Sequence, residues 1–372
     1  MTKETIGLPQ IHITFEKAAN TAVARSERGK IVIVLDDQAA VDLTEYQDME
    51  AVSKSDLSEE SQALINLAFL GGANSVRVLK LVKTGEAPSQ TSDVGGTLAK
   101  IGNYECNWLC APCLTEEADH TAVVSYVEEQ RAAGNPIKAV LANADAPDSE
   151  GIVNFASGTV SCLFADGSTE EFSGAEYSCR IAGILAGLAM NRSATYYVLD
   201  EVTDAVLTLD SDETQDTLVN EGKLIIIFDG EKYKIARGVT SLTTIGEGQS
   251  EEYRKIKIVE AMDLIQSDLR KTFADQYVGK IVNSYDNKQL LINNINTYLS
   301  GLVGTVLDPN YVNVAYLDVD AQKAYLAERG QNVDEMTDAD IQTAKTGSNV
   351  FIGMQLRFVD AMEDIIVKAV LN

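Results

Sequence analysis

Short β-prone runs alternate with helical segments through the first half of this chain, and this order limits the possible folds more than any other feature. The β-prone runs cover residues 31–35, 75–82, 108–114, 137–142 and 158–165, and the helical segments cover residues 59–71, 118–133 and 175–190. Chains that alternate in this way usually form a largely parallel sheet covered by helices. The sequence therefore predicts an α/β layer.

The second half of the chain has a different pattern. The runs 223–228 and 232–236 flank Asp229-Gly230, a pair that favours a type I′ turn and so predicts a β-hairpin. Helices are predicted at residues 252–276 and 287–301, and a strand at residues 312–317. These elements predict an α+β region, so the expected fold class is mixed α/β and α+β.

The composition of the chain indicates where it divides. Residues 84–96 are rich in glycine, proline and serine and form the clearest boundary. We divide the chain into an N-terminal strand arm (1–29), an N-terminal α/β part of the body (30–92), a second α/β domain (93–245), a C-terminal α+β domain (246–361) and a C-terminal strand arm (362–372).

Both ends of the chain carry β-prone segments without an evident partner. Near the start, Ile11, Ile13 and Phe15 alternate with polar residues. The last apolar run, residues 365–371, includes Ile365, Ile366, Val367, Val370 and Leu371. An unpaired apolar terminal strand promotes aggregation unless another chain accepts it. The two ends are therefore predicted to be arms outside the main body.

A further alternating segment precedes the final run. Its apolar positions are Ile352, Met354, Leu356 and Phe358. This period of two is typical of a half-buried strand. Residues 360–364 then form a corner before the terminal run.

The charge of the chain excludes one class of partner. The 372 residues include 30 basic and 56 acidic side chains, which gives a formal net charge of −26. Binding to nucleic acid needs a basic surface, so nucleic acid is not an expected partner. The sequence has neither an apolar run long enough to span a bilayer nor a secretory signal, so we expect a soluble protein made in a cytoplasm.

Three of the five cysteines have the spacing Cys106-x3-Cys110-x2-Cys113, which some iron–sulfur proteins use, and His120 lies nearby. However, the residues around these cysteines have the pattern of a buried strand. A cluster site would need an irregular loop that brings the three thiolates together. Free cysteine behaves as a small apolar residue in such a strand. With Cys162 and Cys179 elsewhere, reduced thiols are expected.

Two other patterns are considered as ligand sites. Gly246 and Gly248 precede a predicted helix, but a third glycine and a phosphate-binding lysine are missing, so a nucleotide site is not predicted. The acid pairs Asp318/Asp320 and Asp338/Asp340 lack the glycine and glutamate of a calcium-binding loop. We expect solvated acidic surface there, and predict neither a cofactor nor a metal.

Several segments together resemble contractile tail sheath proteins of myophages and phage-tail-like bacteriocins. They are Gly7-Leu-Pro-Gln-Ile-His-Ile, residues 182–202 with Ala-Thr-Tyr-Tyr-Val-Leu-Asp-Glu-Val, the hairpin region 222–243, and the ending Phe358-Val-Asp-Ala-Met-Glu-Asp-Ile365. No single segment is specific, but the resemblance covers nearly the whole chain in the same order.

The resemblance implies a structural subunit that forms stacked hexameric rings around an inner tube. Contraction of the sheath would drive the tube through the envelope of the target cell, with residues 17–30 and 360–364 as hinges. The partners would be other copies of the chain, the inner tail tube protein, and baseplate and tail terminator proteins, with no direct membrane insertion. Assembly would occur in the host bacterial cytoplasm, and the mature location would be a phage or bacteriocin particle.

The resemblance also implies exchange of strands between subunits. Ile11, Ile13 and Phe15 would be donated from the N-terminal arm, and Ile365, Ile366, Val367, Val370 and Leu371 from the C-terminal arm. The accepting strand would carry Ile352, Met354, Leu356 and Phe358. Residue alternation would fix the register of each added strand.

The middle domain of this family is described as subtilisin-like, which raises the alternatives of a hydrolase or a non-catalytic binding module. A serine protease needs a histidine base, and the chain offers only His12, in the arm, and His120, for which we expect a surface position. A Gly-x-Ser-x-Gly nucleophile motif is also missing. The sequence therefore predicts a domain without a catalytic triad, and no enzyme.

The densest basic cluster is the candidate contact with the inner tube. Arg254, Lys255 and Lys257 lie at the start of the predicted helix 252–276, and Arg270 and Lys271 lie further along it. The resemblance places parts of the C-terminal domain near the tube. The alternative is that these side chains are solvated or pair with Glu251, Glu252 and Asp268.

Overall fold

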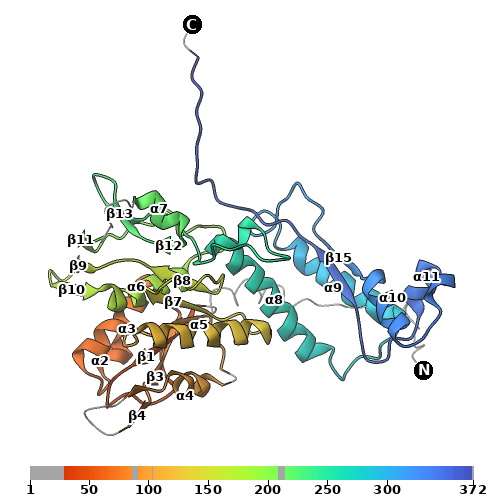
Figure 1. Ribbon diagram of the computed structural model, residues 1–372, viewed down its shortest axis with the longest axis horizontal. Coiled ribbons are helices and arrows are strands. Elements are labelled where there is room, and N and C mark those ends of the chain that lie inside the picture. The colour runs from red at the N-terminus through yellow and green to blue at the C-terminus, as the bar shows by residue number, and fades with distance from the viewer. Residues whose placement is uncertain (1–28, 86–90, 103, 208–213, 371–372) are drawn as a thin grey trace, which may run out of the picture.

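The computed structural model describes residues 29–85, 91–102, 104–207 and 214–370, and a seven-stranded sheet forms the centre of its first half (Figure 1). The strands lie in the order β12 (Lys223–Leu224), β8 (Ile152–Phe155), β7 (Lys138–Ala142), β6 (Trp108–Cys110), β1 (Lys30–Leu35), β3 (Ser75–Lys80) and β2 (Thr44–Tyr46). All neighbours are parallel except β2, which is antiparallel to β3. The predicted parallel sheet is therefore present.

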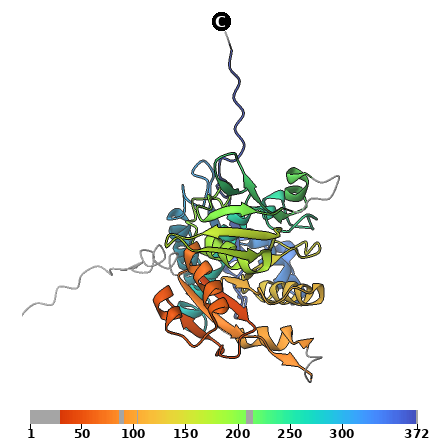
Figure 2. The same cartoon turned by 90° about the vertical axis from the view of Figure 1, so that its left-hand side faces the viewer.

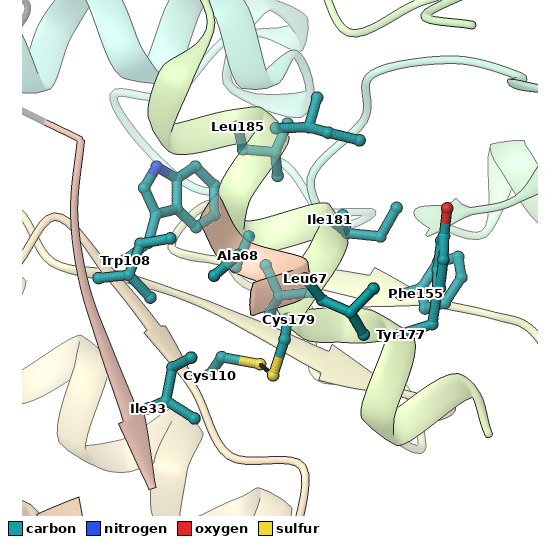
Figure 3. Close-up of a cluster of buried hydrophobic side chains, with 14 of the residues drawn as sticks. Ile33, Leu67, Ala68, Trp108, Cys110, Phe155, Tyr177, Cys179, Ile181 and Leu185 are labelled. Carbon is teal, nitrogen blue, oxygen red and sulfur yellow. Dashed lines mark hydrogen bonds between the residues drawn. The ribbon is translucent and has the colours of Figure 1, made fainter. Parts of the chain in front are cut away.

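Both faces of the sheet are buried, which explains its nearly continuous apolar strands. In β1, Ile31 and Ile33 join one hydrophobic cluster, while Val32 joins the cluster on the opposite face. The first cluster includes residues of α3 (Glu59–Gly71) and α6 (Gly174–Gly187), and the second includes residues of α4 (Val94–Leu98) and α5 (Glu117–Ala132). Figure 3 shows the first cluster around Trp108 and Tyr177.

Helices α3 and α6 approach each other closely because glycine lies at their contact. A Cβ atom at Gly183 would lie only 2.2 Å from the carbonyl oxygen of Ala68. The small-residue run in the predicted helix 175–190 therefore has a packing role.

Two antiparallel sheets extend this α/β body. One has the order β10 (Thr169–Ser173), β9 (Thr159–Leu163) and β11 (Val202–Ala205), and the other pairs β13 (Ile226–Phe228) with β14 (Tyr233–Ile235). The hairpin at Asp229-Gly230 is confirmed. However, the run predicted as one strand, 223–228, is divided between two sheets, because β12 pairs with β8 and only β13 enters the hairpin.

The C-terminal region consists of helices around a two-stranded sheet. Its elements are η2 (Glu251–Arg254), α8 (Ile256–Gln276), α9 (Tyr285–Ser300), β15 (Val314–Leu317), α10 (Val319–Glu328), η3 (Val333–Glu335), α11 (Asp338–Thr343) and β16 (Ile352–Gln355). Apolar residues of α8, α9 and β15 form a separate core. The predicted helix 252–276 begins only at Ile256, because Lys255 has extended backbone angles.

Several sequence expectations differ from the structure in extent. Residues 84–96 do not separate two cores, since strands before and after them belong to the same seven-stranded sheet. This stretch contains β5 (Thr91–Ser92), which pairs with β4 (Lys83–Thr84), and most of α4. The sequence patterns predicted neither β8 nor α10. The remaining short elements are α2 (Met49–Ser53), η1 (Ala99–Ile101) and α7 (Gln215–Asn220). Among the helices in the described ranges, none is long and apolar enough to cross a bilayer.

Buried ion pairs join the α/β body to the C-terminal region. Both guanidinium Nη atoms of Arg131 lie 3.1 Å from the carboxylate oxygens of Asp263 on α8. Lys138 on β7 donates to the same carboxylate at 2.6 Å. Because all three side chains are at least 86% buried, the junction is held by desolvated charges.

Candidate interaction site at the C-terminal arm

The last described residues form an extended segment outside the body. Residues 361–370 belong to no helix or strand, and the end of this segment projects away from the rest of the chain in Figures 1 and 2. Ile366 is 97% exposed and Val367 is 82% exposed. We call residues 365–370 the free arm. The strand predicted at residues 365–371 has no ladder partner within the described part of its own chain, and Leu371 lies outside that part.

The residues just before the free arm are held against the body. The Glu363 carboxylate accepts hydrogen bonds from the Ser193 hydroxyl at 2.8 Å and the Thr195 hydroxyl at 2.6 Å. Asp364 pairs with Arg237 at 2.5 Å. The sequence did not predict these contacts, because the partners are more than 120 residues apart and no local pattern links them.

The predicted accepting strand is shorter than expected but lies beside two parts of the chain. β16 pairs with β15 in antiparallel register, and Phe358 forms a bridge with Leu307 further along. Ile352, Leu356 and Phe358 pack against the C-terminal core. Met354, expected on the same buried side, is 41% exposed because no described element covers it.

One edge of this two-stranded sheet is closed and the other is open. On the outer edge of β15, the Asn296 side chain of α9 pairs with both backbone groups of Ala315, at 2.6 Å to its N–H and 3.0 Å to its C=O. The amide group thus takes the place of a neighbouring strand. Within the described ranges no strand pairs with the outer edge of β16. α9 also contains Asn287, Asn293 and Asn294, so the sequence did not single out Asn296 for this role.

The backbone of residues 351–359 shows which groups face the open edge. Phe351, Arg357 and Val359 bond backbone groups on the β15 side. Alternate residues of a strand direct their backbone groups to opposite edges. The backbone groups of Ile352, Met354, Leu356 and Phe358, the four residues of the predicted accepting strand, therefore face the open edge.

Two of the predicted tube-contact lysines lie at the base of the C-terminal segment instead. Lys255 pairs with Asp360, and the Lys257 ammonium donates to the carbonyl oxygen of Val359. Lys257 is buried, and this burial lowers its pKa, although Asp360 and Glu363 offset part of the effect. A buried Lys257 does not fit the prediction of a charge presented on the surface of the single chain.

The other three cations also make contacts within the chain. Arg254 donates to the carbonyl oxygen of Asn220 at 2.7 Å and lies 3.3 Å from Glu251. Arg270 donates to carbonyl oxygens after α5, and Lys271 lies 3.3 Å from Glu105. Arg270 and Lys271 line a cleft of about 440 Å³ between the body and α8. Arg254 and Lys255 precede α8, so the five cations do not share one helix.

Within the described ranges, the structure does not place a histidine in a catalytic triad. His120 is buried rather than on the surface, because the first turn of α5 packs onto the residues after β6; its Nε2 lies 3.0 Å from the carbonyl oxygen of Leu114. Its Nδ1 is 3.9 Å from Glu117. His12 and the predicted strand residues Ile11, Ile13 and Phe15 lie outside the described residues.

The cysteines are buried or half-buried and do not converge. Cys110 lies 2.9 Å from the Ser178 hydroxyl and 3.5 Å from the Cys179 sulfur, while Cys113 lies against β1. Burial raises the pKa of Cys106 and of Cys113 to about 12. Thiols with such pKa values are protonated at neutral pH and are weak metal ligands. Among the described residues, no group of three or more His, Cys, Asp or Glu side chains could hold a metal.

The other candidate ligand residues have local structural roles. Asp318 caps α10 by accepting from the N–H of Ala321, and Asp340 forms a capping box with Thr337 at the start of α11. The turn containing Gly246 and Gly248 is separated from α8 by η2 and an extended residue. It therefore does not place its N–H groups at the start of that helix.

Two family models match the chain. The phage tail sheath protein central domain matches residues 87–241, and the phage tail sheath C-terminal domain matches residues 248–372. A tail sheath protein of Clostridium phage phiCD119 is 34% identical over 367 residues, which cover 96% of this chain and 98% of that protein. The sequence similarity thus extends along nearly all of both chains.

Solved structures with a similar fold include two sheath proteins. The sheath tail protein from Listeria innocua has a TM-score of 0.65 at 18% identity, covering 91% of this chain and 98% of that one. The helical sheath of the anti-feeding prophage in its contracted state also has a TM-score of 0.65, at 16% identity, covering 92% of this chain and 93% of that one. The shared fold therefore includes both the α/β body and the C-terminal region.

Proposed function

The chain belongs to the phage tail sheath family, and from this premise we propose that its copies form stacked hexameric rings around an inner tube. Contraction of this sheath drives the tube through the envelope of the target cell. The partners are then further copies of the chain, the inner tail tube protein, and baseplate and tail terminator proteins. The free arm supports this most directly, because it exposes apolar residues and has no ladder partner in the described part of its own chain.

The open edge of β16 is the proposed acceptor for the free arm of another copy. The arm points away from its own body, so it cannot return to its own β16 without reversing direction (Figure 1). Asn296 occupies the outer edge of β15, which leaves the β16 edge for an added strand. The backbone groups facing that edge would then gain partners, as in other cases of strand addition.

Each such contact would gain backbone hydrogen bonds and bury apolar side chains. Each backbone hydrogen bond contributes about 0.5–1.5 kcal/mol net, and burying an Ile or Val side chain completely contributes about 1.5–3 kcal/mol. Several bonds and two or three buried side chains such as Ile365 and Val367 would offset the cost of ordering the arm, about 1–2 kcal/mol per backbone residue. The same arithmetic applies to Ile11, Ile13 and Phe15, which we propose as the second donated strand.

The fold of the middle domain, residues 93–245, is consistent with a structural role. We propose that this domain is subtilisin-like in topology, because its parallel sheet is covered by helices on both faces. The family consists of structural tail sheath proteins and not of enzymes. The hydrolase and binding-module alternatives are therefore not retained.

The contact with the inner tube is a separate proposal. Lys271 keeps 69% of its side chain exposed beside the cleft, so of the five basic residues it is best placed to contact a neighbouring surface. Arg254, Lys255 and Arg270 would contribute only after exchanging their present partners. Assembly would take place in the host bacterial cytoplasm, and the assembled sheath would be part of a phage or bacteriocin tail.

Deletion of residues 365–372 tests the assembly proposal. We expect the truncated chain to keep its circular dichroism spectrum and unfolding midpoint, because the free arm makes no contact with the core. The full-length chain should form tubes in negative-stain micrographs, while the truncated chain should sediment as a monomer. The control Lys368→Gln changes one exposed charge in the arm and should polymerise normally. Tubes of normal length from the truncated chain would contradict strand donation.

A further inference from the structure

A polar group holds the base of the free arm against the α/β body. It consists of Ser193, Thr195 and Arg237 on the body and Glu363 and Asp364 on the C-terminal segment, and we call it the root clasp. Glu363 is only 9% exposed in its side chain. Met362, just before it, is 94% exposed, and Ile365, two residues after it, is 79% exposed. One buried carboxylate therefore lies within an otherwise exposed segment.

Backbone N–H groups of the body fix the positions of both hydroxyl oxygens of the root clasp. The Thr195 oxygen accepts from the N–H of Gly238 at 3.0 Å, and the Ser193 oxygen accepts from the N–H of Thr195 at 3.1 Å. Each hydroxyl keeps its one proton for an acceptor, and the Ser193 proton can go either to Glu363 or to the Thr195 oxygen, which lies 3.0 Å away. Both hydroxyls lie within 2.8 Å of the same Glu363 oxygen.

Arg237 adds a positive charge to these donors. Its guanidinium pairs with Asp364 and lies 3.9 Å from the second carboxylate oxygen of Glu363. Hydrogen bonds between charged groups are stronger than neutral ones. The hydrogen bond to Asp364 is also the main reason why the pKa of Arg237 is raised. The body thus presents two hydroxyl donors and one cation to two consecutive acids.

We propose that the root clasp positions the free arm for donation, with Glu363 and Asp364 as positioning residues. This proposal rests on the assembly function proposed above and adds the group that sets the arm's direction. Val359 and Asp360 are also held, by Lys257 and Lys255. Residues 360–364, predicted as a hinge, are therefore anchored at both ends, and the arm leaves the body at Asp364.

Distance measurements on the isolated chain test the clasp itself. Spin labels carried by non-natural residues at Lys368 and at the exposed turn residue Glu231 would report the arm's direction without using native cysteines. We expect a narrow distance distribution in the parent chain and a broad one in Glu363→Ala and Asp364→Asn. The paired exchange Arg237→Asp with Asp364→Arg should narrow it again. Equal widths in the parent and in Glu363→Ala would overturn the clasp.

Polymerisation of the same variants tests the positioning role. Loss of a charge-assisted hydrogen bond should raise the protein concentration needed for tube formation by roughly tenfold or more. The circular dichroism spectrum should stay unchanged, and the control Glu231→Gln, outside the clasp, should polymerise like the parent. A broadened distance distribution with unchanged tube formation would show that the clasp is not a positioning device. If the parent chain itself forms no tubes, the assembly function fails, whereas the distance measurement still decides whether the clasp exists.

Discussion

At the scale of single residues, carboxylates in this acidic chain often accept hydrogen bonds from backbone N–H groups. Asp37, two residues after β1, accepts from the backbone N–H groups of Ala39 and Ser58 and from the Ser58 hydroxyl. Ser58 is in turn the N-cap of α3. Burial alone would raise the pKa of Asp37, but these donors outweigh it and lower the pKa to about 2.

This lowered pKa predicts a pH-dependent contribution to folding. The folded-state pKa of Asp37 lies below its unfolded value of about 3.9, so its stabilisation is present above pH 4 and is lost as the pH falls toward 2. We expect about 2 kcal/mol of unfolding free energy to depend on this residue. Urea unfolding between pH 5 and 2 should show a smaller acid loss in Asp37→Asn than in the parent. The control Asp56→Asn, at an exposed acid nearby, should lose stability with falling pH as the parent does. An equal loss of unfolding free energy in the parent and in Asp37→Asn would contradict a stabilising role for the Asp37 carboxylate.

At the scale of elements, the contact between α3 and α6 depends on the absence of a side chain. An added Cβ at Gly183 would overlap the backbone of Ala68, which cannot move without separating the two helices. We expect Gly183→Ala to lower the free energy of unfolding by about 1–3 kcal/mol or more. Gly95→Ala is a matched control, since its Cβ would find the nearest atom at 3.9 Å and α4 would gain helix propensity. Thermal unfolding midpoints compare the two, and an unchanged midpoint in Gly183→Ala would refute this packing role.

Elements with strong local patterns were predictable from the sequence. The helix predicted at residues 59–71 matches α3, because a capping serine, helical periodicity and a terminal glycine all agree. The run 223–228 was predicted as one strand, since no local signal shows that Ile225 is where the chain leaves one sheet for another. The register of β16 was partly predictable, but its shorter length depends on the contacts of residues 356–359 with residues 306–308.

The candidate site was less predictable than the fold. The apolar ending at Ile365 and Ile366 indicated an arm because composition alone makes an unpaired terminal strand unfavourable. The root clasp could not be inferred, since Ser193 and Glu363 meet only after the two regions have packed. The burial of His120 and Lys257 likewise depends on tertiary contacts that single-residue polarity does not reveal.

At the scale of the whole molecule, the α/β body and the C-terminal region must move together if strands at the ends transmit force between subunits. Their junction contains Asp263 of the C-terminal region between the cations Arg131 and Lys138 of the body. Lys138 also lies 5.1 Å from the centre of the Trp108 ring and 3.0 Å from Glu260. The junction is therefore charged, buried and connected to the central sheet.

Removing the carboxylate at position 263 should weaken this junction strongly. Asp263→Asn would leave Arg131 and Lys138 buried with their charges less well compensated, and losing one partner of a buried ion pair typically costs about 3–5 kcal/mol. The pair Lys271–Glu105 crosses the same junction but is exposed, so Lys271→Gln should cost only about 0–1 kcal/mol. Urea unfolding followed by both Trp108 fluorescence and circular dichroism would measure the difference and show whether the two regions still unfold together. We expect the fluorescence and circular dichroism curves to coincide in the parent and in Lys271→Gln but to separate in Asp263→Asn. If the two curves of Asp263→Asn coincide and its midpoint is unchanged, these charges do not couple the two regions.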